Sequence, residues 1–159
     1  MNLHAFSDWL SATSFSQAIQ VTSWAIPGIQ TVHLLGIAAL FASALVVSLR
    51  IAGYGLTSEP LPAVAQRFIK GMWFLLLILL ATGLLLIIAE PGRTITNPVF
   101  YAKMTMLALA ICITLWLSRV SRRELVSPSG IHVAAAVLGM LLWVGIIFAG
   151  RFIAYVESY

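Results

Sequence analysis

The residue best placed to do chemistry is His33, which lies inside a long apolar stretch of the chain. At the rise of an α-helix it falls about six residues, or roughly 9–10 Å, below the outer start of that stretch. An unpartnered imidazole at such a depth in lipid is costly, so an ionisable group there is a candidate functional group. Gly36 follows one helical turn later and would let a flat macrocycle approach the backbone while the imidazole ligates its iron. The alternative is a neutral imidazole hydrogen-bonded to a neighbouring helix, with Gly36 serving helix packing.

Two methionines on another apolar stretch offer a second ligand. This stretch starts on the outer side near Pro98, which places Met104 and Met106 roughly 9–12 Å deep, at the level of His33. A thioether opposite an imidazole is a known haem arrangement, and soft sulfur also binds copper(I). The two methionines point to different faces of a helix, so at most one is expected to meet His33. Space filling, the commoner role of methionine in an apolar helix, is the alternative.

Three charged residues, Glu90, Arg93 and Lys103, belong to the same outer level. Arg93 and Lys103 could pair with haem propionates, and Glu90 could hydrogen-bond His33. Alternatively, Glu90 pairs with Arg93 or Lys103 and fastens the outer connection.

The other histidines do not complete a two-histidine haem site. His132 opens the last apolar stretch on the inner side, most of a membrane thickness from His33, so the two cannot ligate one iron. His4 could reach His33 only if the N-terminal segment covers the bundle. The sequence contains no Walker loop, dinucleotide-binding glycine pattern, nucleophile elbow or Cys/His metal motif, and it indicates no catalytic residue.

The elements that would position these residues are four apolar runs at about 26–49, 68–89, 99–117 and 133–156. The composition, 61% hydrophobic and 9% charged, is that of a membrane protein. With short connections at 53–66 and 90–98, the runs predict an all-α, polytopic bundle of four transmembrane helices over 26–159, connected up-down-up-down. Small residues on the runs offer close-packing surfaces for the bundle or for a homo-oligomer: Gly36, Gly71, Gly83, Ala135, Gly139 and Gly145.

The placement of the basic residues predicts the orientation. Six flank the first and third connections, and three lie on the other side: Arg50, Arg67, Lys70, Arg119, Arg122 and Arg123 against Arg93, Lys103 and Arg151. The positive-inside rule then puts both termini outside, in the periplasm of a bacterial inner membrane. Because of this placement, the net charge of +4 is no signal for nucleic-acid binding.

Residues 1–25 form a separate, semi-polar segment. Aromatic residues mixed with Ser, Thr and Gln predict helices in the outer interface, which could also cover the mouth of the bundle. Ser14 and Gln17 make a capping-box pattern, which predicts a helix start near Phe15. Asn97 followed by Pro98 predicts the start of the third span, and Ser127 followed by Pro128 that of the fourth.

Several of these residues also carry a family resemblance. The segments 31–36, which contains His33 and Gly36, 82–84 and 89–93 resemble a family of uncharacterised bacterial inner-membrane proteins with four spans. Asn97–Pro98, Phe100 and Lys103–Met104 complete the pattern. This resemblance implies fold and location but no activity. The segment 33–36 is also similar, more loosely, to the first helices of copper-resistance-D-type membrane proteins.

The leading functional hypothesis is a b-type haem electron-transfer protein with its haem near the periplasmic face. His33 would be an axial ligand, Met104 the second ligand, and Arg93 and Lys103 the propionate partners. A quinone or a periplasmic redox protein would exchange electrons with it. Copper handling by His33, Met104 and either Met106 or His4 is the first alternative. The second is a cofactor-free subunit of a larger membrane complex.

Overall fold

The computed structural model describes residues 2–56, 58–121 and 129–153, and every regular element in those ranges is a helix. In chain order they are α1 (Leu3–Ser11), α2 (Ser14–Val21), α3 (Ala25–Ile51), α4 (Leu61–Ala89), α5 (Pro91–Ile95), α6 (Pro98–Ser121) and α7 (Gly130–Phe152). The predicted all-α class is confirmed. Of these helices α3, α4, α6 and α7 are long and apolar enough to span a membrane, as in a multi-pass membrane protein.

The long helices follow the predicted spans closely, with one clear exception. Helix α4 begins at Leu61, well before the expected start at residue 68, so the predicted connection 53–66 was too long. The cause is a proline pair: Pro60 is extended, and Pro62 stands in the first turn, where its missing N–H leaves no bond unmade. Helix α7 is capped by Ser129 and His132 in a capping box; the predicted cap at Ser127–Pro128 lies outside the described residues.

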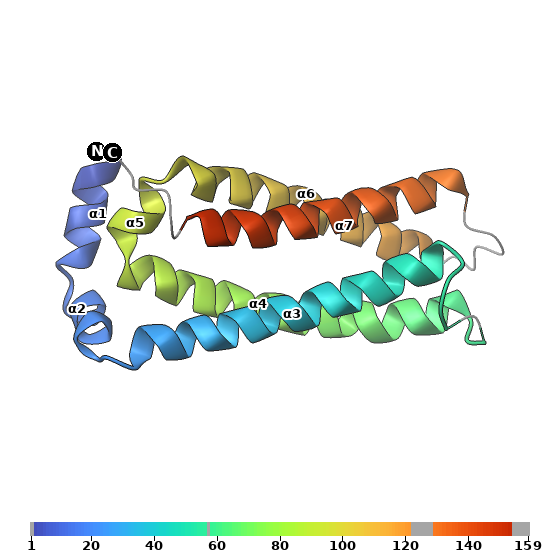
Figure 1. The fold of residues 1–159 in the computed structure, drawn as a ribbon, viewed down its shortest axis with the longest axis horizontal. Helices are drawn as coiled ribbons and strands as arrows, with labels where there is room; N and C mark the ends of the chain where they lie inside the picture. The colour runs from blue at the N-terminus through green and yellow to red at the C-terminus, as the bar shows by residue number, and fades with distance from the viewer. Residues whose placement is uncertain (1, 57, 122–128, 154–159) are drawn as a thin grey trace.

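The bundle consists of two antiparallel hairpins. Helix α3 packs along α4 and α6 along α7, and the hairpins meet mainly through α3 and α7 (Figure 1). Most of the buried core lies in the half of the bundle remote from α1: Leu40, Ala44, Val47, Ile51, Leu61, Ala65, Ile69, Met72, Ala110 and Leu117 are examples. In the other half burial is sparse, and along α6 no residue before Ala110 is buried.

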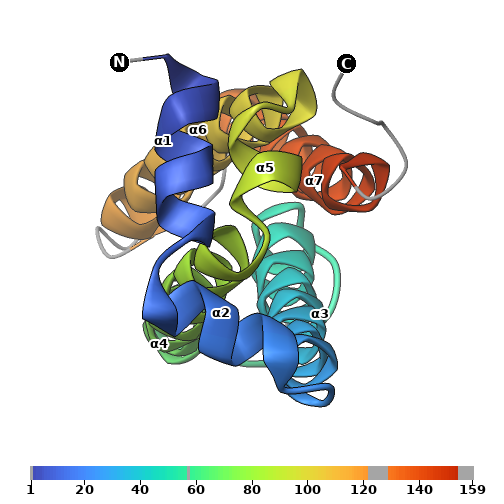
Figure 2. The same ribbon diagram turned by 90° about the vertical axis from the view of Figure 1, so that its left-hand side faces the viewer.

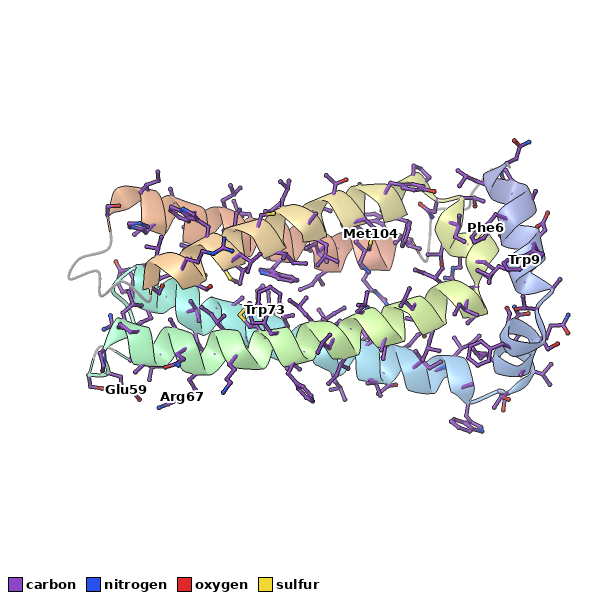
Figure 3. All side chains as sticks on the ribbon, turned by 180° about the vertical axis from the view of Figure 1, so that it is seen from behind. Phe6, Trp9, Glu59, Arg67, Trp73 and Met104 are labelled. Atoms are coloured by element: carbon purple, nitrogen blue, oxygen red, sulfur yellow. The ribbon has the colours of Figure 1, made fainter. Side chains whose placement is uncertain are left out.

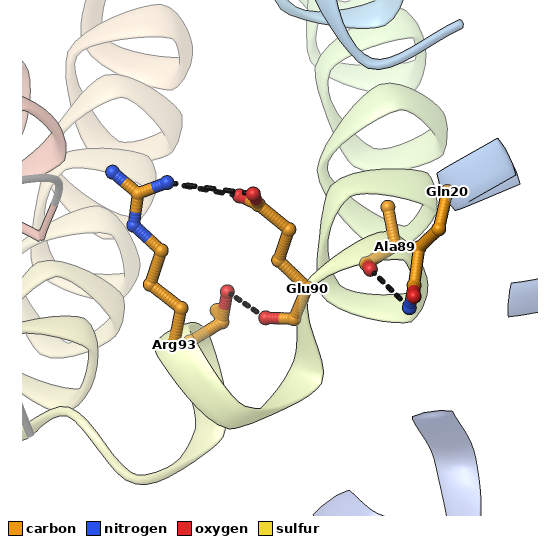
Figure 4. A network of polar contacts seen from close by, with 5 residues as sticks. Gln20, Ala89, Glu90 and Arg93 are labelled. Carbon is orange, nitrogen blue, oxygen red and sulfur yellow. Dashed lines mark hydrogen bonds and ion pairs between the residues drawn. The ribbon is translucent and has the colours of Figure 1, made fainter. Parts of the chain in front are cut away.

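The three short helices cross one end of the bundle, called here the capped end (Figures 1 and 2). Helix α1 packs on α5, and α2 packs on the end of α4. The Ser16 hydroxyl donates to the Ile88 carbonyl at 2.6 Å, and Gln20 Nε2 donates to the Ala89 carbonyl at 2.9 Å (Figure 4). These carbonyls belong to the last turn of α4, where no intrahelical donor exists, so α2 completes the end of that helix.

The N-terminal segment therefore covers the bundle mouth while presenting aromatic side chains outward. Trp9 is 63% exposed and stacks on Phe6 at a centroid distance of 5.8 Å (Figure 3). Exposed tryptophans at a bundle end are typical of the membrane interface. The helix predicted to start near Phe15 is present and begins at Ser14, but its cap is Thr13, whose side chain accepts from the Ser16 amide, in place of the predicted Ser14. Helix α5 was not predicted.

Candidate functional site

His33 on α3 is half-buried and bonded to α4. Its Nδ1 lies 2.7 Å from Thr82 Oγ1, which is also 2.8 Å from the Ile78 carbonyl oxygen. Thr82 has one hydroxyl hydrogen, and a carbonyl can only accept. When that hydrogen goes to Ile78, Nδ1–H of His33 donates to Thr82 Oγ1; in the other tautomer the hydroxyl donates to Nδ1. Among the described residues Nε2 has no hydrogen-bond partner, so in the first tautomer its lone pair is left for a ligand.

The glycine that lies beside the imidazole is Gly83. A Cβ added there would lie 3.6 Å from His33 Cε1. Gly36, which the sequence analysis placed beside a macrocycle, faces α4 instead: its Cβ would lie 3.0 Å from Leu79 Cδ2. This contact fits the helix-packing role of Gly36, because only a hydrogen leaves room for Leu79 at that distance.

Lys103 on α6 is a cation in the same half of the bundle as His33. A Cβ added to Gly150 would lie 3.5 Å from Lys103 Nζ, so the ammonium group sits against α7. In the part of the chain that the structure describes, Lys103 forms no ion pair. An imidazole lone pair and an ammonium group thus share the sparsely packed half of the bundle.

The two methionines are separated by their helix faces, as expected. Met106 packs against α7, where a Cβ on Gly145 would lie 3.0 Å from its sulfur. Met104 follows Lys103, about 100° further round the helix, and is 36% exposed (Figure 3). No contact places either sulfur at His33, so the second ligand stays a prediction.

Glu90 and Arg93 form a salt bridge of 3.2 Å across the start of α5 (Figure 4). Of the two roles considered for Glu90, the structure has the one that fastens the outer connection. The hydrogen-bond partner of His33 is Thr82. Asn97 caps α6 as predicted: its Oδ1 accepts from the Val99 amide at 2.9 Å, and Pro98 is the first helical residue.

The remaining histidines lie away from this site. His132, at the end opposite the cap, stacks on Trp116 at 5.3 Å. His4 lies on α1 over the capped end, as its role in a copper site would require, but its side chain is exposed. The exposed Cys112 sits in the middle of α6.

Three residues of the site escaped the functional prediction: Thr82, Gly83 and Gly150. Thr82 and Gly83 belong to the segment that carries the family resemblance, which was the only signal in the sequence that they matter. Gly150 gave none, because its role depends on a lysine from another helix.

Over the described residues, the fold is a helical bundle with four membrane-length helices, and one half of it holds the imidazole of His33 on one hairpin and the ammonium group of Lys103 on the other. The chain belongs to a family of unknown function, DUF6644, whose model matches residues 6–156. Searches of curated proteins and of solved structures gave no match. Family membership agrees with the resemblance to an uncharacterised family.

Proposed function

We propose that this protein is a b-type haem electron-transfer protein of a bacterial inner membrane, with its haem between the hairpins near the capped end. The observation that carries the proposal is the contact of His33 Nδ1 with Thr82, which leaves Nε2 open to a ligand in the half of the bundle that also holds Lys103. The imidazole keeps a lone pair on Nε2, which is what iron needs from an axial ligand. The ammonium group has no carboxylate partner in the described chain and can bind a propionate.

Two further features of the site fit a bound haem. Gly83 leaves the edge of the imidazole unobstructed, and no residue of α6 before Ala110 is buried, so a bound ligand would add burial to this half of the bundle. Bound iron would supply one-electron chemistry, and the protein would supply the ligand, its orientation and an apolar surrounding. Met104 is the proposed second axial ligand. Arg93, together with Glu90, would assist at the propionates.

The position of Lys103 argues against the copper alternative. The positive charge of Lys103, in the same half of the bundle as His33, opposes the binding of a bare cation, whereas it favours a ligand that carries carboxylates. The third hypothesis, a cofactor-free subunit, predicts no bound group at all.

The orientation proposed earlier accompanies this function. Arg50 and Arg119 stand in the last turns of α3 and α6, at the end opposite the cap, and Arg67 and Lys70 lie in the first part of α4 at that same end. This end would face the cytoplasm, and the capped end with both termini the periplasm. A C-terminal alkaline phosphatase fusion should be active and a fluorescent-protein fusion dark; the reverse result overturns the orientation.

The test is a reduced-minus-oxidised visible spectrum of protein purified in mild detergent from cells supplied with haem. A Soret band with reducible α and β bands is expected. It should be lost in His33→Ala and kept in the matched control His132→Ala, which removes a histidine at the other end. A colourless wild-type protein, or a spectrum indifferent to His33→Ala, refutes the proposal. Lys103→Gln should retain the iron ligand but lower haem occupancy. A quinone or a periplasmic redox protein is the proposed electron partner.

A further inference from the structure

A second candidate site lies under the N-terminal helices. A cavity of about 410 Å³, open to the surface, lies among α1, α2, the end of α4 and the start of α5. Its polar lining includes Ser7, Asp8, Gln20, Glu90 and Arg93. None of these residues is the hydrogen-bond partner of His33, but Glu90 and Arg93 are also the residues proposed to assist at the haem propionates, so the two proposed sites adjoin there.

Ser7 is a polar residue that the fold buries without a partner. It is only 3% exposed, and within the described chain its hydroxyl makes no hydrogen bond. The hydroxyl lies 3.5 Å from the position that a Cβ on Gly92 would take, and both residues line the cavity. The oxygen itself is not fully buried, so it is accessible to a group inside the cavity.

The charges around the cavity favour a cation. Glu90 is paired with Arg93, whereas Asp8 has no ion pair in the described part of the chain. Gln20 uses its amide nitrogen on Ser16 Oγ and the Ala89 carbonyl, which leaves its oxygen as an acceptor. The lining that the structure describes therefore holds two carboxylates, Glu90 and the solvent-exposed Asp8, against one cation, Arg93.

The size of the cavity favours an organic cation over a metal ion. A volume of about 410 Å³ suits a small organic molecule, since ligand pockets begin at roughly 300 Å³. Ile26, Ala89 and Pro91 add apolar contact for a carbon skeleton. We propose that this cavity binds a compact primary amine, with its ammonium group on Asp8 and a hydrogen bond to Ser7. The source is either a soluble amine or the ethanolamine headgroup of a phospholipid, because the cavity lies at the membrane interface.

Calorimetric titration of the full-length protein in maltoside detergent tests this. The probes are ethanolamine and dihexanoyl-phosphatidylethanolamine; their controls are ethylene glycol and dihexanoyl-phosphatidylglycerol, which lack the ammonium group. At least one amine probe should bind, and neither control should compete. Asp8→Asn should weaken binding by about tenfold or more, as for a lost charge-assisted hydrogen bond. Glu59→Gln, which removes a carboxylate at the opposite end, should leave it unchanged.

The outcomes distinguish the two possible sources of the amine. Binding of free ethanolamine supports a soluble amine, and binding of the lipid alone supports a phospholipid headgroup. If Asp8→Asn elutes as an aggregate, Ser7→Ala replaces it, with an expected loss of about threefold to tenfold. No binding by either amine, equal binding of the neutral controls, or affinity unchanged in Asp8→Asn or its substitute overturns the proposal. His33→Ala should not affect this binding.

Discussion

Replacing Thr82 with valine tests the hydrogen bond on which the His33 site rests. Valine keeps the shape of threonine but puts a methyl group where Oγ1 accepts from His33 Nδ1 at 2.7 Å. Thr82 is 9% exposed, so water does not readily take over the lost role. The Ile78 carbonyl keeps its bond within α4, and the damage is confined to the imidazole N–H.

The expected loss of stability is modest. Hydrogen bonds between side chains of membrane helices contribute about 0.5–2 kcal/mol, so Thr82→Val should lower the free energy of unfolding by that amount. The substitution should also change the tautomer of His33. Without the acceptor, the proton is no longer held on Nδ1, and Nε2 becomes partly protonated. Thr82→Ser keeps the hydroxyl and should behave as wild type.

Nitrogen NMR of histidine-labelled, haem-free protein measures the tautomer directly, with His33→Ala to assign the signal. Unfolding in mixed detergent measures stability. Wild-type protein should show a deprotonated Nε2, and Thr82→Val a shift toward the other tautomer. A protonated Nε2 in the wild type, or an unchanged signal in Thr82→Val, would refute the hydrogen-bond assignment. Because haem is absent, this result is independent of the proposed function.

Three further substitutions probe packing, the cap and the buried cation. Gly36→Ala should destabilise the bundle by about 1–2 kcal/mol because its Cβ would press on Leu79 at 3.0 Å, whereas Gly83→Ala, at 3.6 Å from its nearest neighbour, should fold as wild type in the same unfolding assay. Ser16→Ala removes the 2.6 Å hydrogen bond between α2 and the end of α4 and should speed proteolytic cleavage of the N-terminal segment before α3. An unchanged cleavage rate would show that other contacts hold this segment on the bundle. Lys103→Met should stabilise the haem-free protein by about 1 kcal/mol while lowering haem content, because it removes an ammonium group from apolar surroundings. Destabilisation by that change would reveal a structural partner.

The spans were predictable because hydropathy over some twenty residues is a strong signal. The start of α6 was also predictable, because the capping side chain of Asn97 is followed directly by a proline. The prediction was wrong at Pro60 and Pro62: the two prolines predict a turn, whereas Pro62 belongs to the first turn of α4. The short helix α5 escaped prediction because five residues carry too little periodicity to be recognised.

The site was predictable at His33 but not at its partners. Depth along a helix follows from counting residues, whereas the direction of a side chain depends on how the helices rotate against each other. Glu90 was considered as the partner of His33 because both lie near the outer end. The hydrogen-bond partner is instead Thr82, about two turns earlier on α4. For the same reason, depth alone could not decide whether Met104 or Lys103 turns toward His33.

His33 and Lys103 lie in the same half of the bundle but differ in whether they have a partner, and this difference is the main argument for the proposed ligand. His33 has Thr82 as a partner, whereas Lys103 has no ion pair in the described chain. A lysine roughly 8 Å from the start of its helix could extend to the interface and so avoid the apolar interior. Its ammonium group instead rests against Gly150 of α7. An apolar side chain would be expected to pack there at lower cost, and the propionate of the proposed haem would give this ammonium group a counter-charge.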